Sequence, residues 1–278
     1  MQRFFVHLLI IFISVNSYAW NALGHRLVAQ IAYDNLTSES KAFCDKYSKG
    51  YGKSSIHSNF VAGASWLDAI RRKDIHWYDA LHYIDIPFSD DRSKLPPVPQ
   101  INALWGINQA IAVLSSKKSS TSDKRLSLRI LSHLIGDIHQ PLHTVMKVSI
   151  EHPKGDMGGN LFLLTNTPGG KNLHQFWDNG GGAFVGNYKN QRISKTAAKL
   201  QNKWKCDQAL NKKNLREWVN DSHKIALNQV YRLMQYKIPS EQYKQSVQQI
   251  SERQIALAGC RLAYLLNNIN KNNTQNYS

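Results

Sequence analysis

Apolar residues recur at helical spacing along most of this sequence, and this pattern limits its fold more than any other feature. A repeat of this kind buries one face of each helix against a neighbour. It covers residues 22–35, 60–72, 101–115, 124–138, 189–204, 212–233 and 241–266. Neither an internal repeat nor a long linker divides the chain. The pattern therefore predicts an all-α fold, a single mainly helical catalytic domain spanning residues 20–278.

Three segments lack this repeat. Within residues 147–165, glycines separate two short apolar runs, which predicts a small β-hairpin or an irregular excursion. Residues 89–99 are rich in Pro, Ser and Asp and are expected to form a loop. Residues 267–278 form a polar tail that we expect to fray.

Residues 1–19 have the composition of a signal peptide. Arg3 precedes an apolar run over residues 4–15, and Ser17-Tyr18-Ala19 fits a small-residue cleavage site. The run is shorter than the ~20 residues of a spanning helix, which disfavours an uncleaved anchor. The mature chain is thus expected to begin at Trp20, and the protein to be secreted or periplasmic.

Charge and cysteines add weaker constraints. The net charge of +16 suggests an anionic partner, either nucleic acid or a membrane surface, without choosing between them. Export permits disulfides, but Cys44, Cys206 and Cys260 cannot all pair. We expect one bridge and one free thiol, with the pairing open. No CxxC pattern occurs, which argues against a thiolate zinc site.

Two histidine–aspartate pairs carry the chemical information. His133 and Asp137 lie four residues apart on a helix, beside apolar residues, and His174 and Asp178 repeat the spacing. An imidazole and a carboxylate one turn apart can share a zinc ion, although a single such pair is more often a simple ion pair.

Further candidate ligands accompany the two pairs. His143 follows Pro141, and His25, Asp68 and His82 also lie near apolar stripes. Five histidines and three aspartates in such positions predict a site for several metal ions. We expect His139 to support this site without binding metal. The other histidines are expected at the surface: His57, His76, His152 and His223.

Several motifs together resemble the zinc-dependent type I nucleases of the mung bean nuclease kind. They are Trp20–His25 with its Gly24-His25 pair, Ser65-Trp66-x-Asp68-x-x-Arg71, Leu81–Asp85, His133-x-x-x-Asp137 with Gln140–His143, Gly158–Asn160 and Asn172–Asp178. Zinc-dependent phospholipase C, which shares the trinuclear site and helical fold, is the competing interpretation. Asp178, where that enzyme typically has Glu, and the Gly24-His25 pair favour the nuclease. A zinc-binding protein without turnover is a third, less favoured interpretation.

The resemblance implies three Zn²⁺ ions, each with its own set of ligands. Asp68, His82, His133 and Asp137 would hold one ion, and His143, His174 and Asp178 a second. The third would be held by His25, Asp137 and Trp20, the last through its α-amine and carbonyl. Removal of residues 1–19 would thus complete the site.

Four more residues match positions that contact substrate in the family. Arg71 would grip a phosphate oxygen and Asn160 would lie beside the scissile phosphate, so that both join Asp68 and Asp137 as the catalytic set. Tyr83 would stack on a base whose polar edge Asp85 reads. As alternatives, Arg71 could pair with Asp68 or Asp74, Asn160 could only turn the chain, and Tyr83 could belong to the core.

The implied function is cleavage of single-stranded DNA and RNA to products with 5′-phosphates, with 3′-nucleotidase activity. We expect a monomer without stable membrane association. The choice between DNA and RNA stays open.

Overall fold

The structure, a computed structural model, describes residues 20–49, 58–71, 73, 75–165, 167–186, 189–211 and 213–274. The expected signal peptide, His57 and Asp74 lie outside the described residues.

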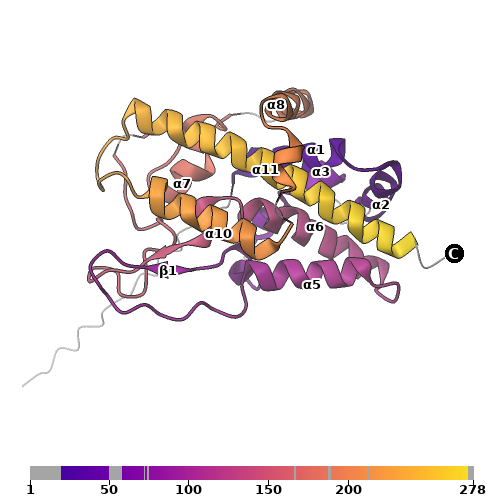
Figure 1. Cartoon of the computed structure of the whole chain (residues 1–278), viewed down its shortest axis with the longest axis horizontal. Helices are drawn as coiled ribbons and strands as arrows, with labels where there is room; N and C mark the ends of the chain where they lie inside the picture. Colours follow the sequence, from indigo (N-terminus) through magenta and orange to yellow (C-terminus); the bar gives the residue numbers. More distant parts are fainter. Residues whose placement is uncertain are drawn as a thin grey trace, which may run out of the picture.

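Helices dominate the described part of the chain (Figure 1), as the apolar spacing predicted. The α-helices are α1 (Ala22–Asp34), α2 (Ser38–Ser48), α3 (Phe60–Gly63), α4 (Trp66–Arg71), α5 (Ala103–Ser115), α6 (Thr121–Asp137), α7 (Leu173–Asp178), α8 (Asn190–Lys203), α9 (Cys206–Ala209), α10 (Leu215–Ile225) and α11 (Glu241–Thr274). Short helical turns lie at Asp79–His82, Pro141–Thr144, Gly180–Gly182 and Ala226–Val230.

Polar side chains start most of the longer helices. The side-chain oxygens of Asn21, Thr37, Asn102 and Ser120 accept hydrogen bonds from the first-turn N–H groups of α1, α2, α5 and α6, respectively. These groups have no partner within their own helix, so each cap stabilises the helix start. The caps fix where each helix begins and thus where its side chains point.

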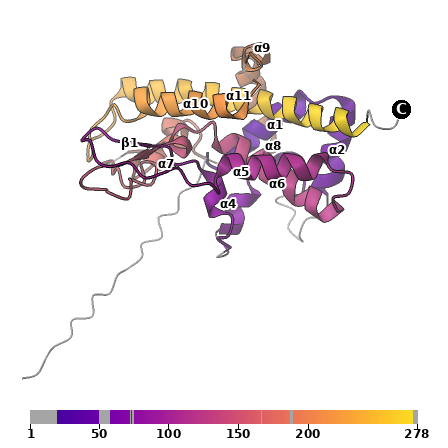
Figure 2. The same ribbon diagram turned by 60° about the horizontal axis from the view of Figure 1, so that its bottom comes forward.

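The longest helix, α11, runs along the molecule and packs against α1 (Figures 1 and 2). A short connection joins α5 to α6, and the two pack side by side. α6 also contacts α1, α4 and α11, so its C-terminal end lies inside the bundle.

Two hydrophobic clusters form the core. The larger contains residues of α1, α5, α6 and α11, together with Trp20 before α1 and Ile138 after α6. The smaller gathers Leu142, Leu173 and neighbouring residues from α7 and the turns around it. The candidate ligands come from the segments of both clusters, so the functional site lies where the two meet.

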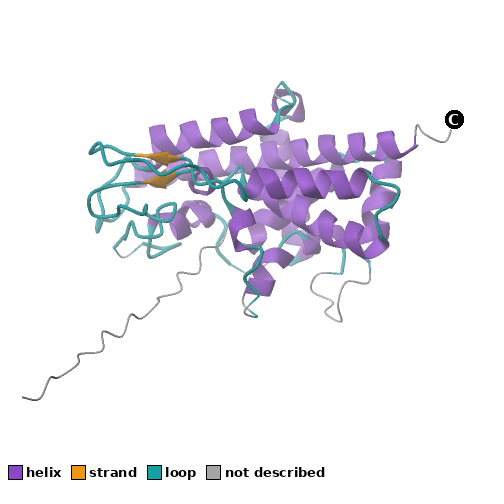
Figure 3. Ribbon diagram, turned by 90° about the horizontal axis from the view of Figure 1, so that it is seen from below, coloured by secondary structure: helices purple, strands orange, loops and turns teal. Residues whose placement is uncertain are grey.

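The predicted excursion is present, but its strands do not form a hairpin. β1 (Pro87–Phe88) pairs in parallel with β2 (Met146–Lys147), at the loop-rich end of the molecule in Figure 3. Leu163 forms a separate antiparallel bridge with Asn172. The partner of β2 thus comes from the segment after His82, far away in the sequence.

Three helix predictions differ from the structure. α2 was not predicted, because its buried positions carry Ser40, Cys44, Tyr47 and Ser48 in place of typical apolar residues. The helix predicted over residues 60–72 is broken after Gly63, and the Ala64 carbonyl binds a histidine described below. α11 continues to Thr274, past the predicted start of the frayed tail. There Asn267 hydrogen-bonds the backbone of Thr37 and Asn35.

The cysteines form one bridge and leave one thiol, as expected. Cys206 of α9 pairs with Cys260 of α11, and Cys44 is buried as a free thiol. Among the described residues, none of the helices combines the length and the apolar character needed to cross a bilayer.

The bridge closes a loop with a sequence separation of 54 residues. Replacing both Cys206 and Cys260 with Ser should lower the free energy of unfolding by about 4 kcal/mol, because the unlinked denatured chain gains conformational entropy. Urea titration of metal-free protein measures this loss, with Cys44→Ser as the control for a buried thiol outside the bridge. A double variant as stable as the wild type would show that the bridge adds no stability.

Candidate metal centre

All nine residues predicted to bind metal lie in the interior, with side chains from separate helices and turns. None is more than 3% exposed: Trp20, His25, Asp68, His82, His133, Asp137, His143, His174 and Asp178. Four helices supply six of these residues. α1 carries His25, α4 carries Asp68, α6 carries His133 and Asp137, and α7 carries His174 and Asp178.

The eight histidines and aspartates fall into three groups whose ligand atoms lie within 4.8 Å of one another. The groups are His25, His133 and Asp137; Asp68, His82 and His133; and His143, His174 and Asp178. The third group contains the same residues as the ligand set predicted for the second zinc ion. The first two share His133, and Asp137 joins them, since its Oδ2 lies 3.1 Å from His82 Nδ1 and its Oδ1 3.4 Å from His25 Nε2.

Backbone carbonyls fix the direction of three imidazoles. The Nδ1 atoms of His133, His143 and His174 lie 2.7, 2.5 and 2.7 Å from the carbonyl oxygens of Ala64, His82 and Gly158. A carbonyl only accepts, so each Nδ1 must carry the proton and donate. Each neutral ring then has its lone pair on Nε2, which is how proteins orient a metal-binding histidine.

Two of these lone pairs face each other. His143 Nε2 lies 3.1 Å from His174 Nε2. With both Nδ1 atoms protonated, two neutral rings have no hydrogen to place between these nitrogens, and their lone pairs repel. A cation bound by both nitrogens removes the repulsion.

Several other polar atoms of the site make no hydrogen bond within the described structure. They are both ring nitrogens of His25, Nε2 of His82, Oδ1 of Asp137 and Oδ2 of Asp178. Burying polar groups without partners costs free energy, and such groups usually bind a metal when they cluster. The donor set of imidazole nitrogens and carboxylate oxygens is the one that zinc prefers. The residues therefore fit zinc.

Electrostatics lead to the same conclusion. Burial, followed by neighbouring histidines, lowers the pKa of His25 and His82, and burial lowers the pKa of His133 to about 3. Burial, followed by the charge of Asp68, raises the pKa of Asp137, and burial also raises that of Asp178. These three imidazoles therefore stay neutral. They supply no positive charge that could offset the negative charge of ionised carboxylates. Divalent cations would supply it.

Residues around the site hold the ligands in place. Gln140 donates from Nε2 to Asp178 Oδ1 at 2.6 Å, while its Oε1 accepts the N–H of Leu142 at 2.6 Å. His139 binds no ligand group. It donates to the Ile135 carbonyl and accepts a hydrogen bond from the buried Arg261 guanidinium at 2.8 Å, so both of its ring nitrogens are engaged away from the candidate ligands.

One of the histidines expected at the surface also takes part. His223 is half-buried and donates from Nδ1 to the Thr144 carbonyl, next to His143. The expectation was wrong for this residue, because α10 packs its face against the Pro141–Thr144 turn. Neither this contact nor that of Arg261 leaves a local pattern in the sequence.

Small residues allow α1 and α6 to approach each other at the site. The Trp20 indole donates from Nε1 to the Gly136 carbonyl at 3.0 Å. His25 stacks on His133 with ring centroids 3.8 Å apart. A Cβ atom on Gly136 would lie 2.8 Å from His25 Nδ1, so only glycine leaves room for this imidazole.

The residues predicted to contact substrate lie around the cluster. Arg71 forms an ion pair with Asp79, a partner not predicted: its Nε lies 2.8 Å from Oδ1, and its Nη2 donates a hydrogen bond to Oδ2 at 3.4 Å. After burial, its charge is one of the causes that lower the pKa of His82 and His133. Tyr83 is half-buried, which excludes a pure core role. Its electrostatic neighbours include Asp85, Asp79 and Arg71.

Asn160 is buried two residues after Gly158, whose carbonyl accepts the hydrogen bond from His174. Its Nδ2 donates to the Met157 carbonyl at 2.8 Å, so it does turn the chain, while its Oδ1 makes no hydrogen bond. Asp85 is half-buried, and burial together with the charge of Asp156 raises its pKa to about 6.

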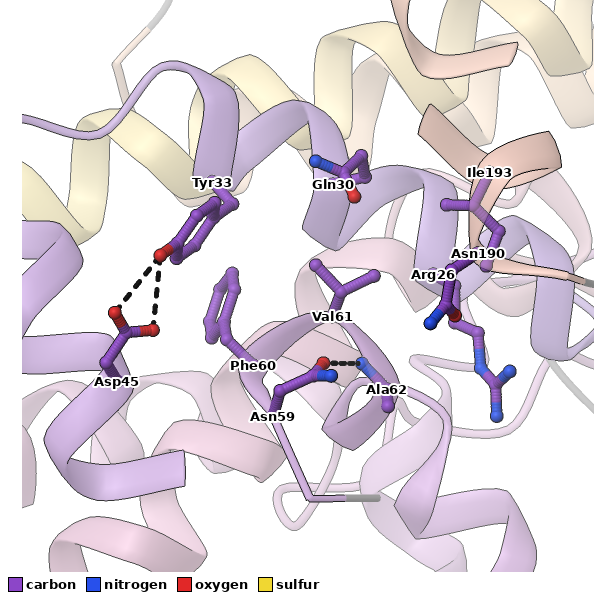
Figure 4. Close-up of a pocket in the computed structure, with 10 residues that line it drawn as sticks. All are labelled: Arg26, Gln30, Tyr33, Asp45, Asn59, Phe60, Val61, Ala62, Asn190 and Ile193. Carbon is purple, nitrogen blue, oxygen red and sulfur yellow. Dashed lines mark hydrogen bonds between the residues drawn. The ribbon is translucent and has the colours of Figure 1, made fainter. Parts of the chain in front are cut away.

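A separate cavity of about 290 Å³ lies between α1, α2, α3 and α8 (Figure 4). Its lining includes Arg26, Tyr33 and Phe60, and the Tyr33 hydroxyl donates to Asp45. None of the eight histidines and aspartates lines it, so it is distinct from the metal centre.

The close approach at Gly136 gives a direct test of the cluster. Gly136→Ala should weaken zinc binding about tenfold, because the new methyl group displaces His25. Gly106→Ala is the matched control: its Cβ would lie 2.8 Å from Leu134 Cδ1, inside the core. That variant should lose stability but keep its zinc affinity. Competition with a chelator measures the affinity, and equal affinities in both variants would contradict the placement of His25.

Comparisons with known proteins agree with this geometry. The sequence pattern of the S1/P1 Nuclease family matches residues 20–271. Endonuclease 3 of Arabidopsis thaliana is 27% identical over 223 residues, which are 74% of this chain and 71% of that protein. Nuclease P1 of Penicillium citrinum is 30% identical over 167 residues, 57% of each chain. Nuclease S1 of Aspergillus oryzae is 27% identical over 169 residues, 58% of this chain and 54% of that protein.

The matched region thus spans a little over half the length of the last two relatives. The family pattern, in contrast, extends from Trp20 through most of α11 and includes every residue of the buried cluster. This confirms the resemblance found in the sequence: the chain belongs to the S1/P1 nuclease family.

Proposed function

We propose that this protein is an exported, zinc-dependent nuclease that cleaves single-stranded DNA and RNA to 5′-phosphate products and also acts as a 3′-nucleotidase. The observation that carries the proposal is the buried cluster of five imidazoles and three carboxylates in a chain of this family. Three zinc ions in this cluster would activate a water molecule and stabilise the departing 3′-oxygen.

The protein's own residues would hold the substrate around that chemistry. The ion pair with Asp79 holds the Arg71 guanidinium in place, where it would contact a phosphate oxygen of the substrate. Its charge already acts on the cluster, as the pKa shifts of His82 and His133 indicate. There it would offset negative charge that builds on the phosphoryl oxygens.

Asn160 and Tyr83 would position the two sides of the scissile bond. The Oδ1 atom of Asn160 is buried and makes no hydrogen bond, and Gly158, two residues earlier, binds His174 through its carbonyl. Tyr83 offers a half-exposed ring next to Asp85. Stacking on that ring would require a base that has left the double helix, which supports the proposed preference for single strands.

Trp20 would contribute through its backbone. Its indole lies in the core and donates to the Gly136 carbonyl. Cleavage after Ala19 would leave its α-amine free for the third zinc. The excess of basic residues would attract a polyanion without choosing the bond that is cut.

The decisive experiment uses purified, zinc-loaded mature protein with circular single-stranded DNA, RNA, duplex DNA and phosphatidylcholine. We expect cleavage of the single strands to 5′-phosphate ends and its loss with chelator. Asp137→Ala should lower kcat at least a thousandfold, because Asp137 lies against both His25 and His82 and so connects two ligand groups. His76→Ala, an exposed histidine paired with Asp79, is the control and should keep most activity. Hydrolysis of phosphatidylcholine alone would favour the phospholipase C alternative.

Asp85 gives a pH-dependent test of base recognition. With a pKa of about 6, its carboxyl group is protonated at pH 5 and ionised at pH 7. The ionised form accepts two hydrogen bonds, which matches the adjacent N–H donors of guanine. We expect KM for 3′-GMP to fall about tenfold as the pH rises through 6, equal to roughly 1.4 kcal/mol of binding free energy.

The control for this effect is Asp85→Asn, which cannot titrate. Its KM for 3′-GMP should lack the step near pH 6, while other pH effects on kcat remain in both proteins. An identical pH profile of KM in the two proteins would rule out the assigned role of Asp85.

A further inference from the structure

We propose that Asn21 is a positioning residue whose side chain ties the start of α1 to the end of α7 and so sets the spacing of the metal ligands. Its Oδ1 accepts the N–H groups of Leu23 and Gly24 at 3.1 Å each. Its Nδ2 donates to Asn179 Oδ1 at 2.6 Å and to the Phe184 carbonyl at 2.9 Å. One amide group thus makes all four of its hydrogen bonds, which holds it in a single orientation.

Asn179 is equally fixed on the other side. It follows Asp178 directly as the C-terminal cap of α7, and its Nδ2 donates to the carbonyls of Gly169 and Gln175 at 2.5 and 2.9 Å. These two acceptors require the nitrogen on that side, so the Asn179 oxygen must face Asn21. The pair of amides therefore forms a directional link between the two helix ends.

The backbone adds a second link at the same place. The N–H of Asn21 donates to the Asp178 carbonyl at 3.2 Å. The peptide bond between Trp20 and Asn21 is trans, so the Trp20 carbonyl points away from Asp178. The direction of this carbonyl, a proposed ligand, therefore depends on the contact with α7.

The link joins two parts of the metal centre that are otherwise far apart in the sequence. His25 lies one helical turn after Asn21, and Asp178 lies immediately before Asn179. α1 packs in the larger hydrophobic cluster and α7 in the smaller one. A change of a few tenths of an ångström between them would alter both ligand groups, since metal sites tolerate little displacement. This inference rests on the proposed function, because it takes zinc as the ion that these ligands bind.

Two substitutions separate this role from helix capping. Asn21→Asp and Asn21→Ser both keep an oxygen that caps α1, so α1 should form normally. Neither supplies the two donors to Asn179 and Phe184. The matched control is Asn214→Asp, which makes the same change at the cap of α10, a helix that carries none of the eight candidate metal ligands.

The experiment measures zinc affinity by chelator competition in the mature protein, together with hydrogen exchange of residues 20–25 in the metal-free protein. We expect both Asn21 variants to bind zinc at least tenfold more weakly than the wild type, and to exchange these amides about tenfold faster. Asn214→Asp should match the wild type in both. The urea midpoint of Asn214→Asp should stay close to the wild-type value, whereas the Asn21 variants should unfold at somewhat lower urea because two acceptors lose their donor.

Unchanged zinc affinity and unchanged exchange in both Asn21 variants would overturn the proposal. A wild type that binds no zinc, with faster exchange in the Asn21 variants, would support the link and reject the proposed function. Equal loss of zinc affinity in Asn214→Asp would show a general effect of added charge and would also overturn it.

Discussion

The rest of the structure depends on one constraint, the burial of three aspartates among five imidazoles. Burial raises the pKa of Asp137 and Asp178, so these carboxylates ionise in the interior only when cations compensate their charge. The protein prepares for this by directing the ring nitrogens inward. His133, His143 and His174 each donate from Nδ1 to a backbone carbonyl, so that the lone pair on Nε2 faces the centre of the cluster.

The two-part hydrophobic core explains why the cluster can be assembled. α1, α4 and α6 bring ligands from the larger apolar cluster, and α7 with the Pro141–Thr144 turn brings them from the smaller one. The ligands at the junction link the two halves, and Gln140 and Asn21 reinforce that link with hydrogen bonds to Asp178 and Asn179. The metal centre therefore belongs to the packing of the protein as much as to its chemistry.

Local patterns made much of this predictable from sequence. Apolar spacing predicted the long helices, and the His-x-x-x-Asp spacing predicted two ligand pairs. The remaining features depend on contacts between distant residues. Arg261 and His139 are 122 residues apart, and Asn21 and Asn179 are 158 apart. No repeat or motif marks such pairs. The break between α3 and α4 was missed for a related reason, since it serves the contact of Ala64 with His133.

The use of backbone carbonyls to orient the imidazoles has a consequence for how this protein can change over time. A side-chain acceptor is lost by one substitution, whereas the carbonyls of Ala64 and Gly158 are present whatever residue occupies those positions, provided that the chain path is kept. Gly158 is constrained through its backbone angle, with φ of 60°, and not through a functional group. Much of the surrounding sequence is thus free to drift while the ligands stay oriented. This is consistent with relatives that share only 27–30% of their residues.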